Sequence, residues 1–271
     1  MAITAAMVKE LREKSGAGMM DAKKALTENN GDLDQAMDWL RTKGLAKAAK
    51  KSGRTAAEGL VAVAVVDGRG VAVEVNSETD FVGKNADFIE LAHKIANTAL
   101  SCKSKEELLK ASLGEMTVEE KLIEQTGVIG EKIQINDFAR IDAEYVGTYI
   151  HAGNKISSLV GFSEKADNIE VAGKDIAMQI AAMNPIALDE KNVDAEVIEK
   201  EIEIAKDQLR QEGKPEEMLE NIAKGKLKKF FKENTLINQQ FIKDSKLSIS
   251  QYLKSYSDSV EVTDFSRVGL V

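Results

Sequence analysis

The chain contains two stretches in which a pair of apolar runs is broken by a tight turn, and this feature restricts the fold most. In the first stretch, residues 59–66 and 71–75 are mostly apolar and flank Asp67-Gly68. Asp-Gly between apolar runs is a strong β-hairpin signal, because these residues accept the backbone angles of a tight turn. Residues 85–101 then carry apolar side chains at helical spacing. The pattern predicts a hairpin followed by a helix.

The same plan returns later in the chain. Residues 144–152 and 155–162 flank Gly153-Asn154, and a helix is expected at about 168–183. An offset of 85 residues places Gly68 on Gly153. We therefore predict two related hairpin-plus-helix subdomains. Because the match is short, shared packing needs explain it as well as common ancestry does.

A helical module is expected before the first hairpin. Glycine-containing turns separate three short apolar patterns in residues 1–44, and Asp32 with Gln35 forms a capping-box pattern for the third helix. We expect Gly44 to end that helix and residues 45–54 to form a linker with some helical character. The core then divides into an N-subdomain, 55–142, and a C-subdomain, 143–271.

An insertion at about 190–232 interrupts the C-subdomain. Its first half has apolar side chains at a coiled-coil spacing, at Ile198, Ile202, Ala205 and Leu209. A Gly-Lys-Pro turn at 213–215 then reverses the chain. An antiparallel coiled-coil hairpin is predicted. Two uses stay open, an arm for self-association or for a partner, and a hairpin that seals only its own seam. The predicted fold class is α+β.

Charge and cysteine content limit the partners. The net charge is -8 with 30% charged residues, which argues against a general nucleic-acid binder, because phosphate binding needs a basic face. The single cysteine, Cys102, excludes a disulfide framework and favours a reducing compartment. The N-terminus has no secretion signal, and no apolar run approaches the roughly 20 residues of a membrane span. We expect a soluble cytoplasmic protein with no direct nucleic-acid or membrane partner.

Motifs that carry covalent chemistry are missing from the sequence. It has no phosphate-binding loop, no H-E-x-x-H and no G-x-S-x-G. The two histidines, His93 and His151, are far apart and neither stands in a metal-ligand pattern. We therefore expect no enzyme, no cofactor and no metal. The rival hypothesis is an enzyme with a carboxylate site in the hairpin subdomains, which needs a deep pocket lined by perturbed acids.

The two copies differ most in the loop after each hairpin. The first copy reads Glu78-Thr79-Asp80-Phe81-Val82-Gly83-Lys84, whereas the second, Ser163–Ile169, lacks the Asp-Phe pair. Phe81 has two interpretations: a wedge presented to a partner with Asp80 beside it, or a ring tucked under the helix with Asp80 as N-cap. Met19 and Met20 pose a similar choice between a binding surface and one core plus one surface residue.

Two runs in the expected order resemble the bacterial elongation factor Ts family. The first contains Ser15-Gly16-Ala17-Gly18-Met19-Met20-Asp21 and Lys23-Lys24-Ala25-Leu26, and the second is Glu74-Val75-Asn76-Ser77-Glu78-Thr79-Asp80-Phe81-Val82. The resemblance covers nearly the whole chain. It implies an N-terminal module similar to ubiquitin-associated domains. That module alone would also suit a ubiquitin-associated-type adaptor, which leaves the second run unexplained.

The resemblance implies a function. It makes the chain a guanine-nucleotide exchange factor for elongation factor Tu that promotes GDP release during translation elongation. Thr79, Asp80, Phe81 and Val82 match the family segment that disturbs the magnesium and phosphate site of the GTPase. We call Thr79–Val82 the wedge segment, with Phe81 as the wedge and Asp80 as its polar companion.

Further contacts follow from the same resemblance. The N-terminal module would dock on the GTPase domain through residues that include Leu11, Met19, Met20 and Lys23. Ile129-Gly130-Glu131 and His151 match other positions of partner contact. Family members often continue past the last strand with a further segment. Because this sequence ends at Val271, we expect that C-terminal module to be absent or reduced.

Overall fold

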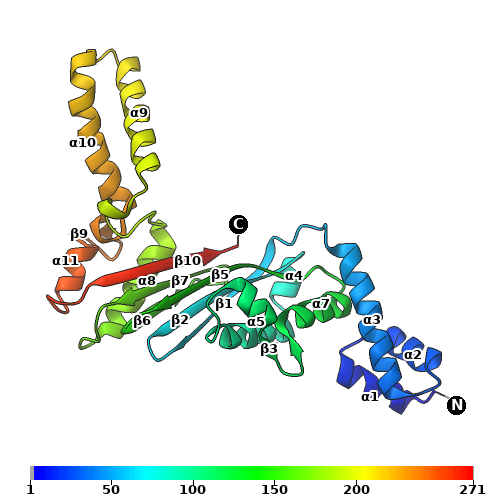
Figure 1. The fold of residues 1–271 in the computed structure, drawn as a ribbon. Helices are drawn as coiled ribbons and strands as arrows, with labels where there is room; N and C mark the ends of the chain where they lie inside the picture. Colours follow the sequence, from blue (N-terminus) through cyan, green and yellow to red (C-terminus); the bar gives the residue numbers. More distant parts are fainter. Residues whose placement is uncertain (1–2, 271) are drawn as a thin grey trace. The chain divides into compact units, whose positions relative to one another are not determined.

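The computed structural model describes residues 3–270, which form a mixed helix-and-sheet fold (Figure 1). The helix-and-sheet class is as predicted. The described residues gather into two compact units. The first contains the chain up to Ala64, then Val73–Phe138 and Gly269 onward, and the second contains Val65–Ala72 and Ala139–Val268. The four predicted domain ranges stay a prediction, and their outer ends, residues 1–2 and 271, lie outside the described residues.

The first unit begins with three helices, α1 (Ala5–Ser15), α2 (Met19–Glu28) and α3 (Leu33–Lys51). Thr4 caps α1 by accepting the Met7 N–H, and Asp32 caps α3 by accepting the Gln35 N–H. Small and branched apolar side chains close a core between the helices: Val8, Leu11, Ala22, Ala25, Leu26 and Ala36.

The expectation that Gly44 ends the third helix is wrong, because α3 continues to Lys51. The reason is a helix crossing. A Cβ atom on Gly127 of α7 (Val118–Ile129) would lie 2.8 Å from the Gly44 Cα atom, so the two backbones touch. Packing against α7 outweighs the low helix propensity of glycine, and Gly127 permits the close approach. The Arg41–Glu120 ion pair, at 2.9 Å, joins the same two helices.

A three-stranded sheet in the order β1-β2-β5 follows. Its strands are β1 (Glu58–Val66), β2 (Arg69–Ser77) and β5 (Gln134–Asp142). The predicted turn is present, with Asp67 and Gly68 both at positive φ. The chain between β2 and β5 contains short and long helices and a two-stranded ribbon: α4 (Asp80–Gly83), α5 (Ala86–Ala99), α6 (Lys105–Lys110), β3 (Ser112–Leu113), β4 (Met116–Thr117) and α7.

The second unit has its own three-stranded sheet, in the order β10-β7-β6. Strands β6 (Tyr145–Ile150) and β7 (Ile156–Phe162) are antiparallel, and β10 (Val262–Gly269) comes from the end of the chain. Helix α8 (Ile169–Met183) packs on β6 and β7. Phe162, Ile176 and Ile180, all 0% exposed, lie in the core that this packing creates.

Helices α9 (Ala195–Gln211) and α10 (Glu216–Asn234) lie side by side as a hairpin of the second unit (Figure 1). Ala205 and Leu209 of α9 are buried, as are Leu219 and Ala223 of α10. Short elements flank the hairpin in the sequence. The short helix η1 (Glu190–Asn192) comes before it, and four elements come after it: η2 (Leu236–Asn238), β8 (Gln240–Phe241), β9 (Asp244–Ser248) and α11 (Ile249–Lys254). Among residues 3–270, the helices are too short or too polar to cross a bilayer.

Candidate functional site

Phe81 stands on α4, a helix of four residues between β2 and α5. Its side chain is 81% exposed, and no residue of α4 is buried. The alternative in which Phe81 tucks under the helix is therefore wrong. Asp80 is also not the N-cap, because Thr79 holds that position and Asp80 is the first helical residue. The wedge segment thus presents an aromatic ring and a carboxylate on one short helix.

The carboxylate of Asp80 has a local partner. Lys84 Nζ lies 2.6 Å from Asp80 Oδ2, one helical turn along. The side-chain hydrogen bond to Asp80 raises the pKa of Lys84. The pair is exposed, so it orients both side chains more than it stabilises the fold.

Thr79 is tied to the residue that follows α7 and its C-cap, Gly130. The Thr79 N–H donates to Glu131 Oε2 at 2.9 Å, and the Thr79 hydroxyl donates to Glu131 Oε1 at 2.7 Å. Beside it, Glu78 Oε1 accepts the Lys132 N–H at 2.7 Å. That bond, with the Arg54 guanidinium, holds the pKa of Glu78 below its ordinary value. The structure therefore brings the wedge segment and the Ile129–Glu131 region together.

Three further residues, which no sequence motif marks, complete this junction. Arg54 Nη1 donates to Glu78 Oε2 at 3.1 Å, and Lys132 Nζ donates to the Arg54 carbonyl at 2.9 Å. Lys51, the last residue of α3, donates to the Gly130 carbonyl. All these contacts join residues more than 20 positions apart, so no local pattern marks them.

The two methionines at the start of α2 are both on the surface. Met19 is 60% and Met20 76% exposed, so the alternative with one of them in the core is wrong. Lys23 is exposed one turn further on. Asp21 pairs with Lys43 at 2.6 Å and with Lys47, and these hydrogen bonds lower the pKa of Asp21.

The other predicted site residues differ in their exposure. Leu11 is 1% exposed within the core of α1–α3, so its side chain supports the module from inside. Ile129 is half-buried at the end of α7, and Gly130 caps that helix at φ 83°. His151 belongs to the second unit, where it is exposed and its Nδ1 lies 3.2 Å from the Tyr149 hydroxyl.

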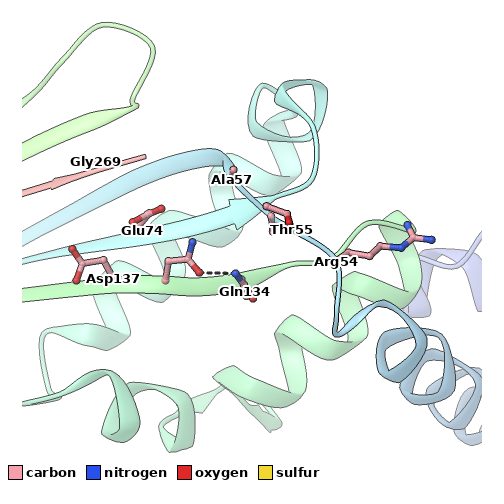
Figure 2. A pocket seen from close by; sticks show the side chains of 9 residues that line it. Arg54, Thr55, Ala57, Glu74, Gln134, Asp137 and Gly269 are labelled. Atoms are coloured by element: carbon pink, nitrogen blue, oxygen red, sulfur yellow. Dashed lines mark hydrogen bonds between the residues drawn. The ribbon is translucent and has the colours of Figure 1, made fainter. Parts of the chain in front are cut away.

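A pocket of about 420 Å³ lies in the first unit beside β2 and β5 (Figure 2). Glu74 and Asp137 supply its carboxylates, and Glu74 also accepts the Asn76 amide at 2.6 Å. None of the predicted site residues is among its lining residues. Within residues 3–270, no group of three or more His, Cys, Asp or Glu side chains is placed to hold a metal ion.

Comparisons with known proteins agree with the resemblance. A family model described as elongation factor TS matches residues 78–270, which is more than half of the chain. The elongation factor Ts proteins of Flavobacterium psychrophilum and Christiangramia forsetii are each 55% identical, over 99% of this chain and 98% of their own length. That of Ruegeria sp. is 52% identical, over 99% of this chain and 92% of its own.

These matches place the chain in the class of translation elongation factors. Within that class, the chain belongs to the elongation factor Ts family.

Proposed function

We propose that the chain is a guanine-nucleotide exchange factor that promotes GDP release from elongation factor Tu. The observation that carries the proposal is Phe81, an aromatic ring 81% exposed on the four-residue helix α4. A single exposed apolar side chain is common on protein surfaces, but this ring lies in the segment that the family resemblance assigns to the GTPase contact, and aromatic anchors often dominate interfaces. Asp80 lies next to it and adds a negative charge near the ring.

The proposed mechanism is a linkage between two binding events. A GTPase holds its nucleotide phosphates partly through a magnesium ion, so a wedge that disturbs the ion weakens nucleotide binding. By reciprocity, the nucleotide weakens binding of the factor by the same ratio. The factor therefore binds the empty GTPase well, and incoming GTP expels it. This action needs surface complementarity and no covalent step, so we assign the chain no enzymatic activity and no cofactor.

The N-terminal module provides a second proposed contact. Met19, Met20 and Lys23 form an exposed group at the start of α2, and Leu11 keeps the module folded beneath them. Methionine is flexible and polarizable, which suits a surface that adapts to a partner. Ile129, Gly130 and His151 are proposed as further contacts.

Two further parts of the proposal concern the setting. We place the exchange activity in the cytoplasm, where translation factors act, with no direct nucleic-acid or membrane contact. Self-association through α9 and α10 also stays a prediction. Ile204 and Met218, 40% and 49% exposed on this hairpin, are the apolar side chains that a second copy would cover.

The test uses elongation factor Tu loaded with a fluorescent GDP. Catalytic amounts of the chain should accelerate GDP release. Phe81→Ala should reduce the acceleration roughly 30-fold, since an interface anchor contributes about 2 kcal/mol or more, and the further change Asp80→Ala should reduce it again. Val171→Ala, which trims a residue 52% exposed on α8, is the matched control and should leave the rate unchanged.

Each outcome of this assay decides one point. Full activity of the double variant would overturn the wedge assignment. Absence of acceleration by the unmodified chain would overturn the exchange function. Circular dichroism of each variant shows whether a lost activity reflects a lost fold.

A further inference from the structure

The N-cap residue of α4 does not cap its helix in the usual way. A threonine at this position normally turns its hydroxyl to accept a backbone N–H of the first turn. Thr79 has the extended backbone of an N-cap, φ -124° and ψ 155°, but its side chain makes no such bond. Its hydroxyl and its own N–H both donate to the Glu131 carboxylate, at 2.7 and 2.9 Å. Each carboxylate oxygen thus holds one donor of Thr79.

Helix α4 is too short to hold its position alone. It contains four residues, none of them buried, whereas helix formation is unfavourable until several turns exist. Its C-terminal end is fixed by backbone bonds, Lys84 N–H to Asp80 O at 3.2 Å and Asn85 N–H to Val82 O at 3.0 Å. Its N-terminal end depends on the residue before it, because that residue sets the direction in which the helix starts.

Glu131 is itself held firmly. It follows Gly130, the left-handed C-cap of α7, whose N–H donates to Thr126 O at 3.1 Å. The next residue, Lys132, donates its N–H to Glu78 at 2.7 Å. The bonds therefore run in both directions: Glu78 accepts from Lys132, and Glu131 accepts from Thr79. This reciprocal pairing joins the start of the wedge segment to the end of a long helix.

We propose that Glu131 is the positioning residue of the wedge segment, which it holds in its binding orientation before the partner arrives. The inference rests on the proposed exchange function and adds a residue that need not touch the nucleotide site. Pre-ordering a loop removes the entropy cost of fixing it on binding. A chain without this pairing would still complete the same complex, but it would need a higher concentration to do so.

The test compares Glu131→Ala with Glu119→Ala. Glu119 is an exposed acid in the first turn of α7, so its loss changes the charge equally without touching Thr79. In the fluorescent-GDP assay, Glu131→Ala should raise the concentration for half-maximal exchange about tenfold, with the maximal rate kept within about twofold. Thr79→Val, which removes one of the two donors, should give a smaller increase. Glu119→Ala should behave as the unmodified chain.

Amide hydrogen exchange of the free protein supplies the second measurement. In Glu131→Ala, the Thr79, Lys84 and Asn85 amides should exchange about tenfold faster than in the unmodified chain, while amides in α8 keep their rates. Unchanged amide rates in a folded variant would overturn the proposal. So would faster amides with an unchanged half-maximal concentration. If the unmodified chain does not accelerate GDP release, the proposed exchange function is wrong. Faster amide exchange in Glu131→Ala would then show only that the pairing is structural, and the positioning role would be overturned as well.

Discussion

The loops that follow the two hairpins occupy equivalent places in sequence but use their side chains oppositely. In the first unit, the strand ends at Ser77, which is buried, and the ring of Phe81 is 81% exposed. In the second unit, the residue 85 positions after Ser77 is Phe162, 0% exposed, and the counterpart of Phe81 is Ala166, packed against the core. The two units thus place their aromatic rings at different positions, one inside the core and one on the surface. Phe162 therefore contributes to the core of its unit, whereas Phe81 does not.

The two loops are also fastened differently. The second is joined to the residue that precedes β10 of its own unit, since Ser163 N–H donates to Glu261 O and Glu261 N–H donates to Ser163 Oγ, both at 2.9 Å. The first is joined through carboxylates, Glu78 and Glu131, to the residues after α7. Because side-chain hydrogen bonds hold the first loop on one side, its other side can stay exposed. A segment that binds a partner needs such an exposed side.

The largest expected effect concerns the two phenylalanines. Phe162→Ala should lower the free energy of unfolding by about 3–5 kcal/mol, because it leaves a cavity in a closed core. Phe81→Ala should change it by less than about 0.5 kcal/mol, because the ring has few contacts to lose. Urea unfolding followed by circular dichroism measures both. A loss above about 2 kcal/mol for Phe81→Ala would show that this ring is packed in solution and that the two rings do not differ in their role.

The sequence predicted the features that depend only on residues close together in the chain. Apolar runs around Asp67-Gly68 and Gly153-Asn154 placed both hairpins, because strand and turn preferences act over a few residues. The prediction that Gly44 ends the third helix was wrong, since the neighbour of Gly44 in space is Gly127 on another helix. Exposure of Phe81 could not be decided either, because a loop ring packs or projects according to what lies beneath it. The Glu131–Thr79 bonds span 52 residues and leave no local pattern.

The second prediction compares equivalent backbone positions, Gly83 and Asn168. A Cβ atom on Gly83 would lie 2.8 Å from the Gly59 carbonyl oxygen, a backbone atom that cannot move aside cheaply. Gly83→Ala should therefore lower the free energy of unfolding by roughly 1–2 kcal/mol and reduce exchange activity by displacing α4. Thermal unfolding and the fluorescent-GDP assay measure the two effects.

Asn168→Gly is the matched control in the second loop. Asn168 has a left-handed backbone, φ 58°, which glycine adopts without strain. The substitution should change stability by no more than about 0.5 kcal/mol, in either direction. Equal losses of stability at the two positions would mean that the two loops do not differ in how strongly they depend on their backbone conformation.

The smallest expected effect is a difference between the two loops in how protein stability depends on pH. The Lys132 N–H and the Arg54 guanidinium lower the pKa of Glu78, whereas its counterpart, Ser163, does not titrate. A lowered folded-state pKa adds stability that is complete above the unfolded value, about 4.3, and is lost as the pH falls through the folded value. Glu78→Gln should therefore lower the free energy of unfolding by up to about 1 kcal/mol at pH 7 and by progressively less below about pH 4.

The control is Ser163→Ala, whose free energy of unfolding should differ from that of the unmodified chain by a constant amount across the same pH range. Urea unfolding from pH 3 to 7 gives both curves, and a Glu78→Gln curve parallel to that of the unmodified chain would show that the first loop is not held through this charge.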